Sequence, residues 1–515
     1  MMSQSSLGGS AGDHRSCYTR TSVAVAGRIG ITYPADPPFH PSESYPEYPF
    51  QADDLSQIPN HAYAVVRECL RLLGLDRERF GQESWNPLGE IIKAGDHVLI
   101  KPNAVLDIHL SGDDLFSVVT HASVIRAVID YVLIALGGRG KVSIADAPQF
   151  NADFENYIKA TGLQKVVDFF RMRDMPGVEI LDLRRWSARL DESLGIYTQR
   201  SRSDLAGDPL GYSEIDLGPL SMLTDLPGLD RLYGADFDYT MTRKNHNGLH
   251  HMYLIANSVL DADVIVSIPK LKTHRKTGAS LNIKGLVGTN GDKNYLAHYR
   301  VGPPSSGGDE YPDGKEALRH ISLQYQRFSS KWLLTHNRRF LEHSFVLLEK
   351  IRAFAARFSR RIGVLAPRKS GVSDIAYGNW SGNDTAWRMA VDLLRIVMYS
   401  DRAGIVCSEP QRRFFCLLDG ITAGEGEGPL APTPRLFGRV IAGTNPVAVD
   451  VTGASVMGIE PRTLRILRCF QDGRADWALC RDFDAIAVSL PGMDTPCKPG
   501  GIRLGDLPFR MPSGW

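Results

Sequence analysis

The feature that most constrains the fold is an apolar, β-branched run at residues 264–268, which stops at Pro269 and passes into a cationic segment. A strand that is buried on both faces reads as such an uninterrupted apolar run, and this is typical of a parallel α/β sheet. In open α/β sheets, ligands bind beyond the carboxyl ends of the strands. Six basic side chains follow the run within sixteen residues: Lys270, Lys272, His274, Arg275, Lys276 and Lys284. The sequence therefore predicts an anion site at the end of this strand.

The rest of the chain alternates apolar strand patterns with helical ones, which indicates an α/β fold with a mostly parallel sheet and helices on both faces. Strands are predicted at residues 22–26, 96–101, 141–146, 178–183, 262–268, 414–418, 438–442 and 485–490. Helices are predicted at residues 61–73, 120–136, 152–171, 385–399 and 446–457. We interpret the pattern as two Rossmann-like lobes with an α-helical insertion.

Breaks in this alternation suggest the domain boundaries. The predicted segments are a disordered tail (1–21), a first α/β lobe (22–190), an irregular or β-rich insertion (191–261), the cationic strand and loop of the second lobe (262–314), a basic helical insertion (315–375) and the remainder of the second lobe (376–515).

The predicted helical insertion is strongly basic. Residues 315–361 contain 11 Lys and Arg but only three Glu, and their apolar residues recur at helical spacing. Two interpretations remain open. The helices lie on the protein with a solvated basic face, or they contact an anionic membrane surface or a protein partner.

Composition excludes several classes of protein. The chain of 515 residues has a net charge of +1, which gives no bulk attraction to nucleic acid. Its seven cysteines show no CxxC spacing, so no iron–sulfur cluster is expected, and a redox protein is the least favoured alternative. The N-terminal residues lack the apolar core of a signal peptide, and no apolar stretch reaches the ~20 residues of a membrane span. A cytoplasmic protein is predicted.

Lysine suits a bound phosphate or carboxylate because it is a compact charge, and nearby glycines let backbone N–H groups approach the anion. The phosphate-binding pattern GxxxxGK[ST] is absent at the strand ends. Lys272 and Lys284 are also candidates for a base or a Schiff-base former if desolvated, and His274 for a proton shuttle. The predicted substrate contacts are Lys101, Asn103, Asp146, Lys270, Lys272 and Thr277.

A glycine-rich acidic segment, residues 419–430, carries Asp419, Glu425 and Glu427. Carboxylates are the ligands of hard cations, so these three residues are candidate ligands for Mg²⁺ or another divalent cation. Glu425 is also a candidate acid or base. The alternative is an acidic surface turn that the lysines neutralise.

A third polar segment follows the cationic one. His298 is a candidate proton carrier, and Arg300 is a candidate substrate contact because a guanidinium can hold a carboxylate or phosphate with two hydrogen bonds.

Six motifs together resemble a known family. They are VLIKPN (98–103), IADAP (144–148), IPKLKTHRKTG (268–278), LNIKGLVG (281–288), DGITAGEGEGPL (419–430) and NPVAVDVTGASVMG (445–458). In this order they resemble domain-of-unknown-function family 362, over most of residues 95–460. The resemblance implies a two-lobed α/β protein, often without an assigned activity. Some members carry a ferredoxin-type cysteine module, which this sequence lacks, and the insertion at 315–375 is larger than in shorter members.

The sequence favours an enzyme that acts on a small phosphorylated or carboxylated substrate in a cleft between the two lobes, with the reaction, proton abstraction or group transfer, left open. In this hypothesis the lysines face Glu425 and its neighbouring carboxylates across the cleft. The alternative is a protein without catalytic activity that binds an anion, a membrane surface or an assembly partner through residues 315–361.

Overall fold

The computed structural model describes residues 19–515 apart from residues 51–53, 174, 176, 192–195, 236–237, 315–327, 330, 335, 337–341, 348–349, 352–374, 478–479, 503 and 505–506. Nearly all of the predicted tail and most of the predicted basic insertion at 315–375 lie outside the described residues.

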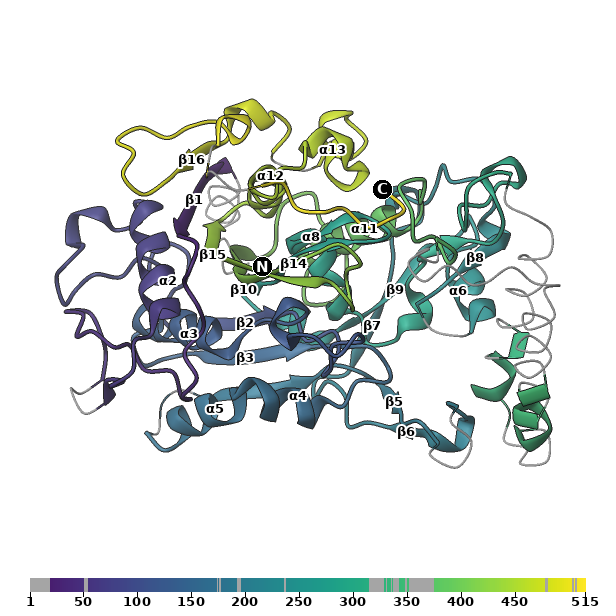
Figure 1. Cartoon of the computed structure of the whole chain (residues 1–515), viewed down its shortest axis with the longest axis horizontal. Helices are drawn as coiled ribbons and strands as arrows, with labels where there is room; N and C mark the ends of the chain where they lie inside the picture. Colours follow the sequence, from purple (N-terminus) through teal and green to yellow (C-terminus); the bar gives the residue numbers. More distant parts are fainter. Residues whose placement is uncertain are drawn as a thin grey trace, which may run out of the picture.

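A single large sheet forms the centre of the molecule (Figure 1). Its order in the described residues is β16-β1-β15-β14-β10-β2-β3-β4, and β11 and β12 attach beside β14. The strands are β1 (Ser22–Gly27), β2 (His97–Pro102), β3 (Lys141–Asp146), β4 (Val178–Asp182), β10 (Val264–Ile268), β11 (Lys270–His274), β12 (Gly278–Ser280), β14 (Arg413–Glu425), β15 (Thr433–Gly443) and β16 (Ala487–Ser489).

The sheet is mixed but mostly parallel. β10 lies between β2 and β14 and is parallel to both, with Val264 opposite Val98 and Arg413. β3 and β4 continue the parallel pairing beyond β2, whereas β15 runs antiparallel to β14 and β1. The α/β class is confirmed. Strands of both predicted lobes pair within this sheet, so two separate Rossmann-like lobes are not shown.

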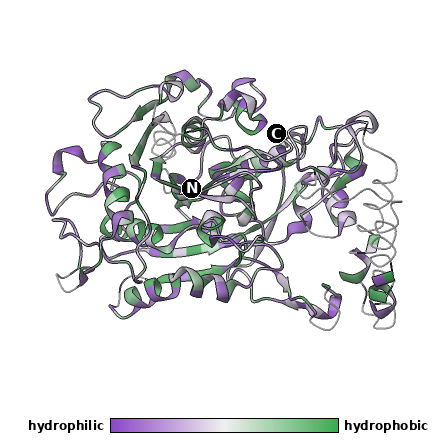
Figure 2. Cartoon of the chain, in the orientation of Figure 1, coloured by the Kyte–Doolittle hydropathy of each residue, from purple (hydrophilic) through white to green (hydrophobic). Residues whose placement is uncertain are grey.

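Alternate residues of the central strands enter two different apolar cores, as the pleat of a strand requires. Val264 and Val266 of β10 pack in one core, and Ile265 packs in the other. Helices α2, α3 and α5 cover the first core, whereas α8, α11, α12 and α13 cover the second. Hydrophobic residues accordingly concentrate along the strands and the inner faces of these helices (Figure 2).

The α-helices with bounds in the described residues are α2 (His61–Leu72), α3 (Ala122–Leu136), α4 (Phe154–Thr161), α5 (Leu163–Arg171), α6 (Tyr239–Asn245), α7 (Asn257–Asp261), α8 (Asn282–Gly285), α11 (Ala386–Tyr399), α12 (Pro446–Val456) and α13 (Arg465–Gln471). No helix in this part of the chain combines the length and apolar character that a bilayer crossing requires.

Short strands in and next to the segment between the predicted lobes form three small sheets. They pair two by two as β5 with β6, β7 with β9, and β8 with β13. Their bounds are β5 (Trp186–Ala188), β6 (Arg202–Asp204), β7 (Tyr212–Asp216), β8 (Leu232–Tyr233), β9 (Met252–Ala256) and β13 (Tyr299–Arg300). The predicted domain boundaries themselves stay a prediction.

Three local predictions were wrong. The helix predicted at 152–171 is two helices, because Gly162 (φ 77°) takes a left-handed conformation that ends α4. The cationic segment is not a loop, because β11 pairs with β14 and with β12. The strand predicted at 414–418 is longer at its carboxyl end, because β14 pairs with β15 as far as Glu425.

Candidate functional site

A cavity of about 400 Å³ lies beyond the carboxyl ends of β2 and β3, in the position where open α/β sheets bind ligands. Its volume is in the range of small-molecule sites. Basic and imidazole side chains form much of its wall: Lys101, Lys272, His274, Arg275, Lys276, Lys284, Lys293 and His298. Two carboxylates, Asp146 and Glu427, also line it. The cavity wall is therefore strongly basic.

Apolar side chains from three loops complete the wall. They are Val105 and Leu110, Ala147, Pro148 and Phe150, and Pro429, Leu430 and Ala431. Two backbone hydrogen bonds join these loops: Leu110 N–H donates to the Leu430 carbonyl (3.1 Å), and Gln149 N–H donates to the Val105 carbonyl (3.1 Å). The cavity thus offers both charged and apolar surface to a ligand.

The ends of β2 and β3 contribute a buried ion pair. Lys101 Nζ lies 2.8 Å from Asp146 Oδ1, and Asp146 Oδ2 accepts the Ala104 N–H at 2.7 Å. Gly288 approaches this pair so closely that a Cβ there would lie 1.7 Å from Asp146 Oδ1. Both charges of this pair are already balanced, so Lys101 and Asp146 shape the wall more than they attract an anion.

Lys270 and Lys272 on β11 have different surroundings, because the pairing of β11 with β14 shifts register between them. Lys270 Nζ is fully buried and contacts Asp419 Oδ2 and the Tyr33 hydroxyl, each at 2.7 Å, and it does not line the cavity. Lys272 lines the cavity, where its Nζ donates to the carbonyls of Val118 (2.6 Å) and Pro429 (3.0 Å). Burial, reinforced by the charges of Lys270 and Lys284, lowers the pKa of Lys272.

Lys284 differs from the other cationic side chains of the wall in its contacts. It lies in α8, lines the cavity and makes no hydrogen bond or ion pair with any described residue. Burial and the neighbouring charges of Lys276 and Lys293 lower its pKa to about 7. The first turn of α8 is held by Asp450 of α12, which accepts the N–H groups of Asn282 (2.8 Å) and Ile283 (2.9 Å).

His274 is the last residue of β11, and Lys276 lies on the turn between β11 and β12. The Lys276 N–H donates to His274 Nδ1 at 3.0 Å, while the Lys276 ammonium donates to the Tyr377 carbonyl. Burial lowers the pKa of Lys276 to about 7 and the pKa of His274 well below its ordinary value. The His274 imidazole is therefore neutral near pH 7.

His298 lies just before β13 and lines the same cavity. Its Nδ1 lies 3.0 Å from the Leu296 carbonyl. Burial and the charge of Lys284 hold the pKa of this imidazole well below its ordinary value. His298 and His274 are thus both neutral side chains among cationic ones.

The three predicted metal ligands do not converge on one point. Asp419 is buried against Lys270 and accepts the Tyr33 hydroxyl at 2.6 Å. Glu425 lies outside the cavity and pairs with Arg510 (2.8 Å) and Arg435 (3.1 Å). Glu427 lines the cavity but pairs with Arg275 (2.8 Å). Across the described residues, no group of three His, Cys, Asp or Glu side chains is arranged to hold a metal ion.

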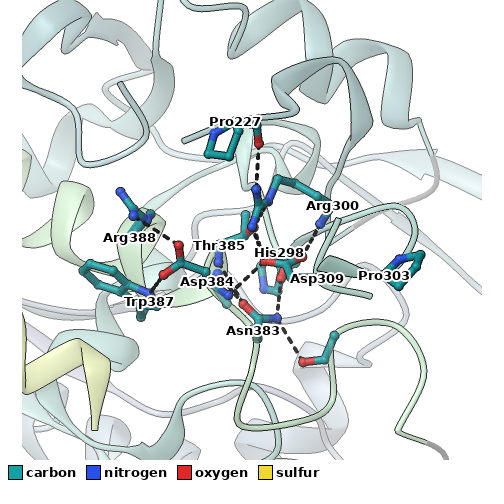
Figure 3. Close-up of polar contacts among 12 residues, drawn as sticks. Pro227, His298, Arg300, Pro303, Asp309, Asn383, Asp384, Thr385, Trp387 and Arg388 are labelled. Atoms are coloured by element: carbon teal, nitrogen blue, oxygen red, sulfur yellow. Dashed lines mark hydrogen bonds and ion pairs between the residues drawn. The ribbon is translucent and has the colours of Figure 1, made fainter. Parts of the chain in front are cut away.

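Of the three remaining predicted substrate contacts, one lines the cavity and two lie outside it. Asn103 lines the cavity, and its amide donates to the Val118 carbonyl at 2.6 Å. Thr277 does not line it and donates to the Ala279 carbonyl at 3.0 Å. Arg300 also lies outside, where its guanidinium contacts Asp309 (3.4 Å) and the Pro227 carbonyl (2.6 Å) in the network of Figure 3.

Three cationic residues of the wall had no role assigned from sequence, Arg275, Lys276 and Lys293. Lys276 belongs to the basic cluster that follows the apolar run at 264–268, and this position in the sequence could have marked it as a residue of the cavity wall. Lys293 opens η8 (Lys293–Tyr295) and donates to the Ala147 carbonyl at 2.7 Å. No local pattern marks it, because the contact spans 146 residues of sequence.

Comparison with protein families gives one match, to the domain of unknown function DUF362, over residues 98–185 and 219–455. The matched residues exceed half of the chain. The chain belongs to the DUF362 family. No curated protein matches the chain.

The DUF362 match contains every residue that lines the cavity, from Lys101 to Ala431. It leaves out residues 1–97, 186–218 and 456–515, which include β1, α2, β5, β6, β7, α13 and β16. The candidate site of this DUF362 protein is therefore built from the family domain, and the resemblance noted in the sequence is confirmed.

Proposed function

We propose that this DUF362 protein is an enzyme that binds a small phosphorylated or carboxylated substrate in the basic cavity. The observation that carries the proposal is Lys284, an ammonium group that lines the cavity without a partner among the described residues. A buried charge without a counter-ion is costly, and a bound anion removes that cost.

The charge balance of the wall supports the same ligand class. Six Lys and Arg side chains line the cavity against two carboxylates, and both carboxylates are in ion pairs, with Lys101 and Arg275. Lys272, Lys276 and Lys284 have no carboxylate within ion-pair distance in the described part of the chain. An anion that binds between them would raise the pKa of all three.

Two features favour an enzyme over an anion carrier. Both imidazoles of the wall are neutral and each keeps one ring nitrogen without a hydrogen bond to the described residues, so both can exchange a proton or a hydrogen bond with a ligand. Lys272, His274 and Lys284 are also buried, which strengthens electrostatic effects on a reacting group beside them. Proton abstraction and group transfer both fit this arrangement.

In this proposal the substrate cleft predicted between the two lobes is the basic cavity, whose wall takes residues from both predicted segments. Lys101 and Asp146 belong to the first predicted lobe, whereas Lys272 and Lys284 belong to the second. A divalent cation is not needed for the proposal, because Asp419, Glu425 and Glu427 are each satisfied by a cationic side chain.

Thermal unfolding with inorganic phosphate, sugar phosphates and organic acids tests the proposal, because a ligand of the folded state raises the melting temperature. We expect a stabilising anion, and we expect Lys284→Met to weaken its binding at least tenfold. The matched control is Lys165→Met, which removes an exposed lysine of α5. Equal responses of the two variants to every anion would contradict the proposal.

The alternative function rests on the basic residues 315–361, most of which lie outside the described residues. Co-sedimentation with anionic vesicles at low and high salt separates it from the cavity, because a surface contact of this kind weakens with salt. Lys284→Met leaves such binding unchanged.

A further inference from the structure

The two imidazoles of the cavity wall are held in opposite tautomers. His298 Nδ1 lies 3.0 Å from the Leu296 carbonyl, which can only accept, so this nitrogen carries the proton. His274 Nδ1 receives the N–H of Lys276 at 3.0 Å, so this nitrogen carries the lone pair. In a neutral ring the other nitrogen has the opposite role. Nε2 of His298 is therefore an acceptor, and Nε2 of His274 is a donor.

Both rings line the cavity, and neither Nε2 makes a hydrogen bond within the described part of the chain. The neutral form of each ring follows from its surroundings. Burial is the main cause, and charge adds to it: Lys284, Lys276 and Lys272 repel a positive charge on His274, and Lys284, Lys276 and Lys293 repel one on His298. One cavity thus presents a proton acceptor, a proton donor and the ammonium of Lys284.

The backbone of His298 is fixed by a network that does not enter the cavity (Figure 3). Asn383 Nδ2 donates to the His298 carbonyl at 3.0 Å, while its Oδ1 accepts the N–H groups of Thr385 (3.0 Å) and Ala386 (2.9 Å) at the start of α11. Asp309 connects this network to Arg300 and Thr385. Asn383 is therefore a positioning residue for His298, although it lies 85 residues away in sequence.

We propose that this cavity catalyses proton transfer at a carbon next to a carbonyl group of a small phosphorylated or carboxylated substrate, with His298 as the base and His274 as the hydrogen-bond donor. The inference rests on the proposed function and assigns its reaction class. The C–H bond breaks, its proton goes to His298 Nε2, and its electron pair moves into the carbonyl to give an enolate oxygen. His274 Nε2–H and the Lys284 ammonium stabilise that oxygen.

Return of a proton from His298 Nε2 to the same carbon restores the carbonyl and completes an exchange of hydrogen with solvent, so no oxidant or reductant is consumed. The bound anion also adjusts the base. Its negative charge offsets the lysines that disfavour a protonated His298, which raises the basicity of Nε2 when substrate is present. The apolar wall from Val105, Phe150 and Leu430 limits the water that competes for the proton.

Nuclear magnetic resonance of the full chain with ¹⁵N-labelled histidine tests the tautomers without a substrate. We expect a protonated Nδ1 on His298 and a protonated Nε2 on His274, each signal being assigned by its loss in His298→Gln or His274→Gln. The same tautomer on both rings, or a charged ring at pH 7, would overturn the assignment.

Deuterium uptake from heavy water into dihydroxyacetone phosphate and pyruvate, measured by mass spectrometry, tests the reaction. We expect uptake with one of these two probes, and we expect His298→Gln to lower it at least ~100-fold while inorganic phosphate still binds. His274→Leu is expected to lower the rate ~100-fold, and His274→Gln far less, because the glutamine amide keeps a donor near Nε2.

The outcomes separate this inference from the function on which it rests. If phosphate binds through Lys284 but neither probe takes up deuterium, the proton-transfer inference fails and anion binding stands. Uptake that persists in His298→Gln also overturns it. If no anion binds, the proposed function fails as well.

Discussion

At the scale of single residues, Lys272 and Lys284 differ although both are buried lysines of one cavity wall. The Lys272 ammonium already donates to the carbonyls of Val118 and Pro429, whereas Lys284 has no partner in the described residues. Lys272 therefore has a structural role, because its ammonium links β11 to the backbone at Val118 and Pro429, and it also adds positive charge to the wall. The sequence alone does not distinguish the two lysines, because both belong to the cationic cluster that follows one apolar run.

Lys272→Met is expected to lower stability by about 1–3 kcal/mol, because two buried carbonyls lose their donor. Lys284→Met is expected to keep or raise stability, because it removes a desolvated charge. Urea unfolding of both variants without added anion checks this contrast. A larger loss of stability in Lys284→Met than in Lys272→Met would contradict it.

Glu427 is the one predicted metal ligand that lines the cavity, and it neutralises Arg275 there. Glu427→Gln is expected to tighten phosphate binding about threefold, equivalent to ~0.6 kcal/mol, because a partly exposed repulsive charge is removed. Glu425→Gln is the matched control, since Glu425 pairs with Arg435 and Arg510 outside the cavity. Isothermal titration measures the phosphate affinity of both variants. An equal change in the two affinities would contradict phosphate binding in the cavity.

At the scale of elements, α8 depends on α12. Asp450 of α12 accepts the N–H groups of Asn282 and Ile283 and also the Asn282 side-chain amide (2.8 Å), so it caps the short helix that carries Lys284. Burial nevertheless raises the pKa of Asp450 to about 7. Because α8 has only one turn, its orientation is set by this contact more than by its own backbone.

Asp450→Asn is expected to lower stability by about 1–3 kcal/mol, because an amide has one acceptor oxygen and one N–H donor would face its NH₂ group. The displaced helix is also expected to weaken phosphate binding several-fold through Lys284. Urea unfolding and phosphate titration measure the two effects. Weaker stability with unchanged phosphate binding would show that α8 holds its place without Asp450.

At the scale of the whole molecule, the net charge of +1 conceals a local excess of positive charge. Burial lowers the pKa of both Lys276 and Lys284 from 10.5 to about 7, so the unfolded chain binds more protons than the folded one between these values. Stability without anions should therefore rise with pH from about 7 to about 10. Below pH 7 both states are protonated, and this contribution is constant.

Urea unfolding at pH 7 and pH 10 in phosphate-free buffer measures this rise, which we expect to reach several kcal/mol at most, since one pKa unit corresponds to ~1.4 kcal/mol and both lysines contribute. Lys284→Met should reduce the rise, and Lys165→Met should leave it unchanged. Added phosphate at pH 7 should stabilise the protein and flatten the dependence. A stability that falls across this range would contradict the buried-lysine assignment.

Much of the fold was predictable because its signals are local. Uninterrupted apolar runs indicated β2, β3 and β10, and the Asn445-Pro446 start indicated α12, where the Asn445 side chain does cap the helix. Two predictions, the cationic loop and the early end of the strand at 414–418, were wrong for one reason. β11 and the outer part of β14 contain glycine, lysine and threonine, and they are strands because they pair with each other.

By itself, the sequence determined the α/β class, the strand that ends in cations and the residue types that can hold an anion, since these follow from short-range patterns of burial and charge. Only the tertiary structure decided which charges are available. Asp419 neutralises Lys270 from 149 residues away, Arg435 and Arg510 occupy Glu425, and Lys284 is left without a counter-ion in the described chain. Ion pairing depends on distance in space, and the register of β11 against β14, with Lys270 opposite Asp419, set the distance for that pair.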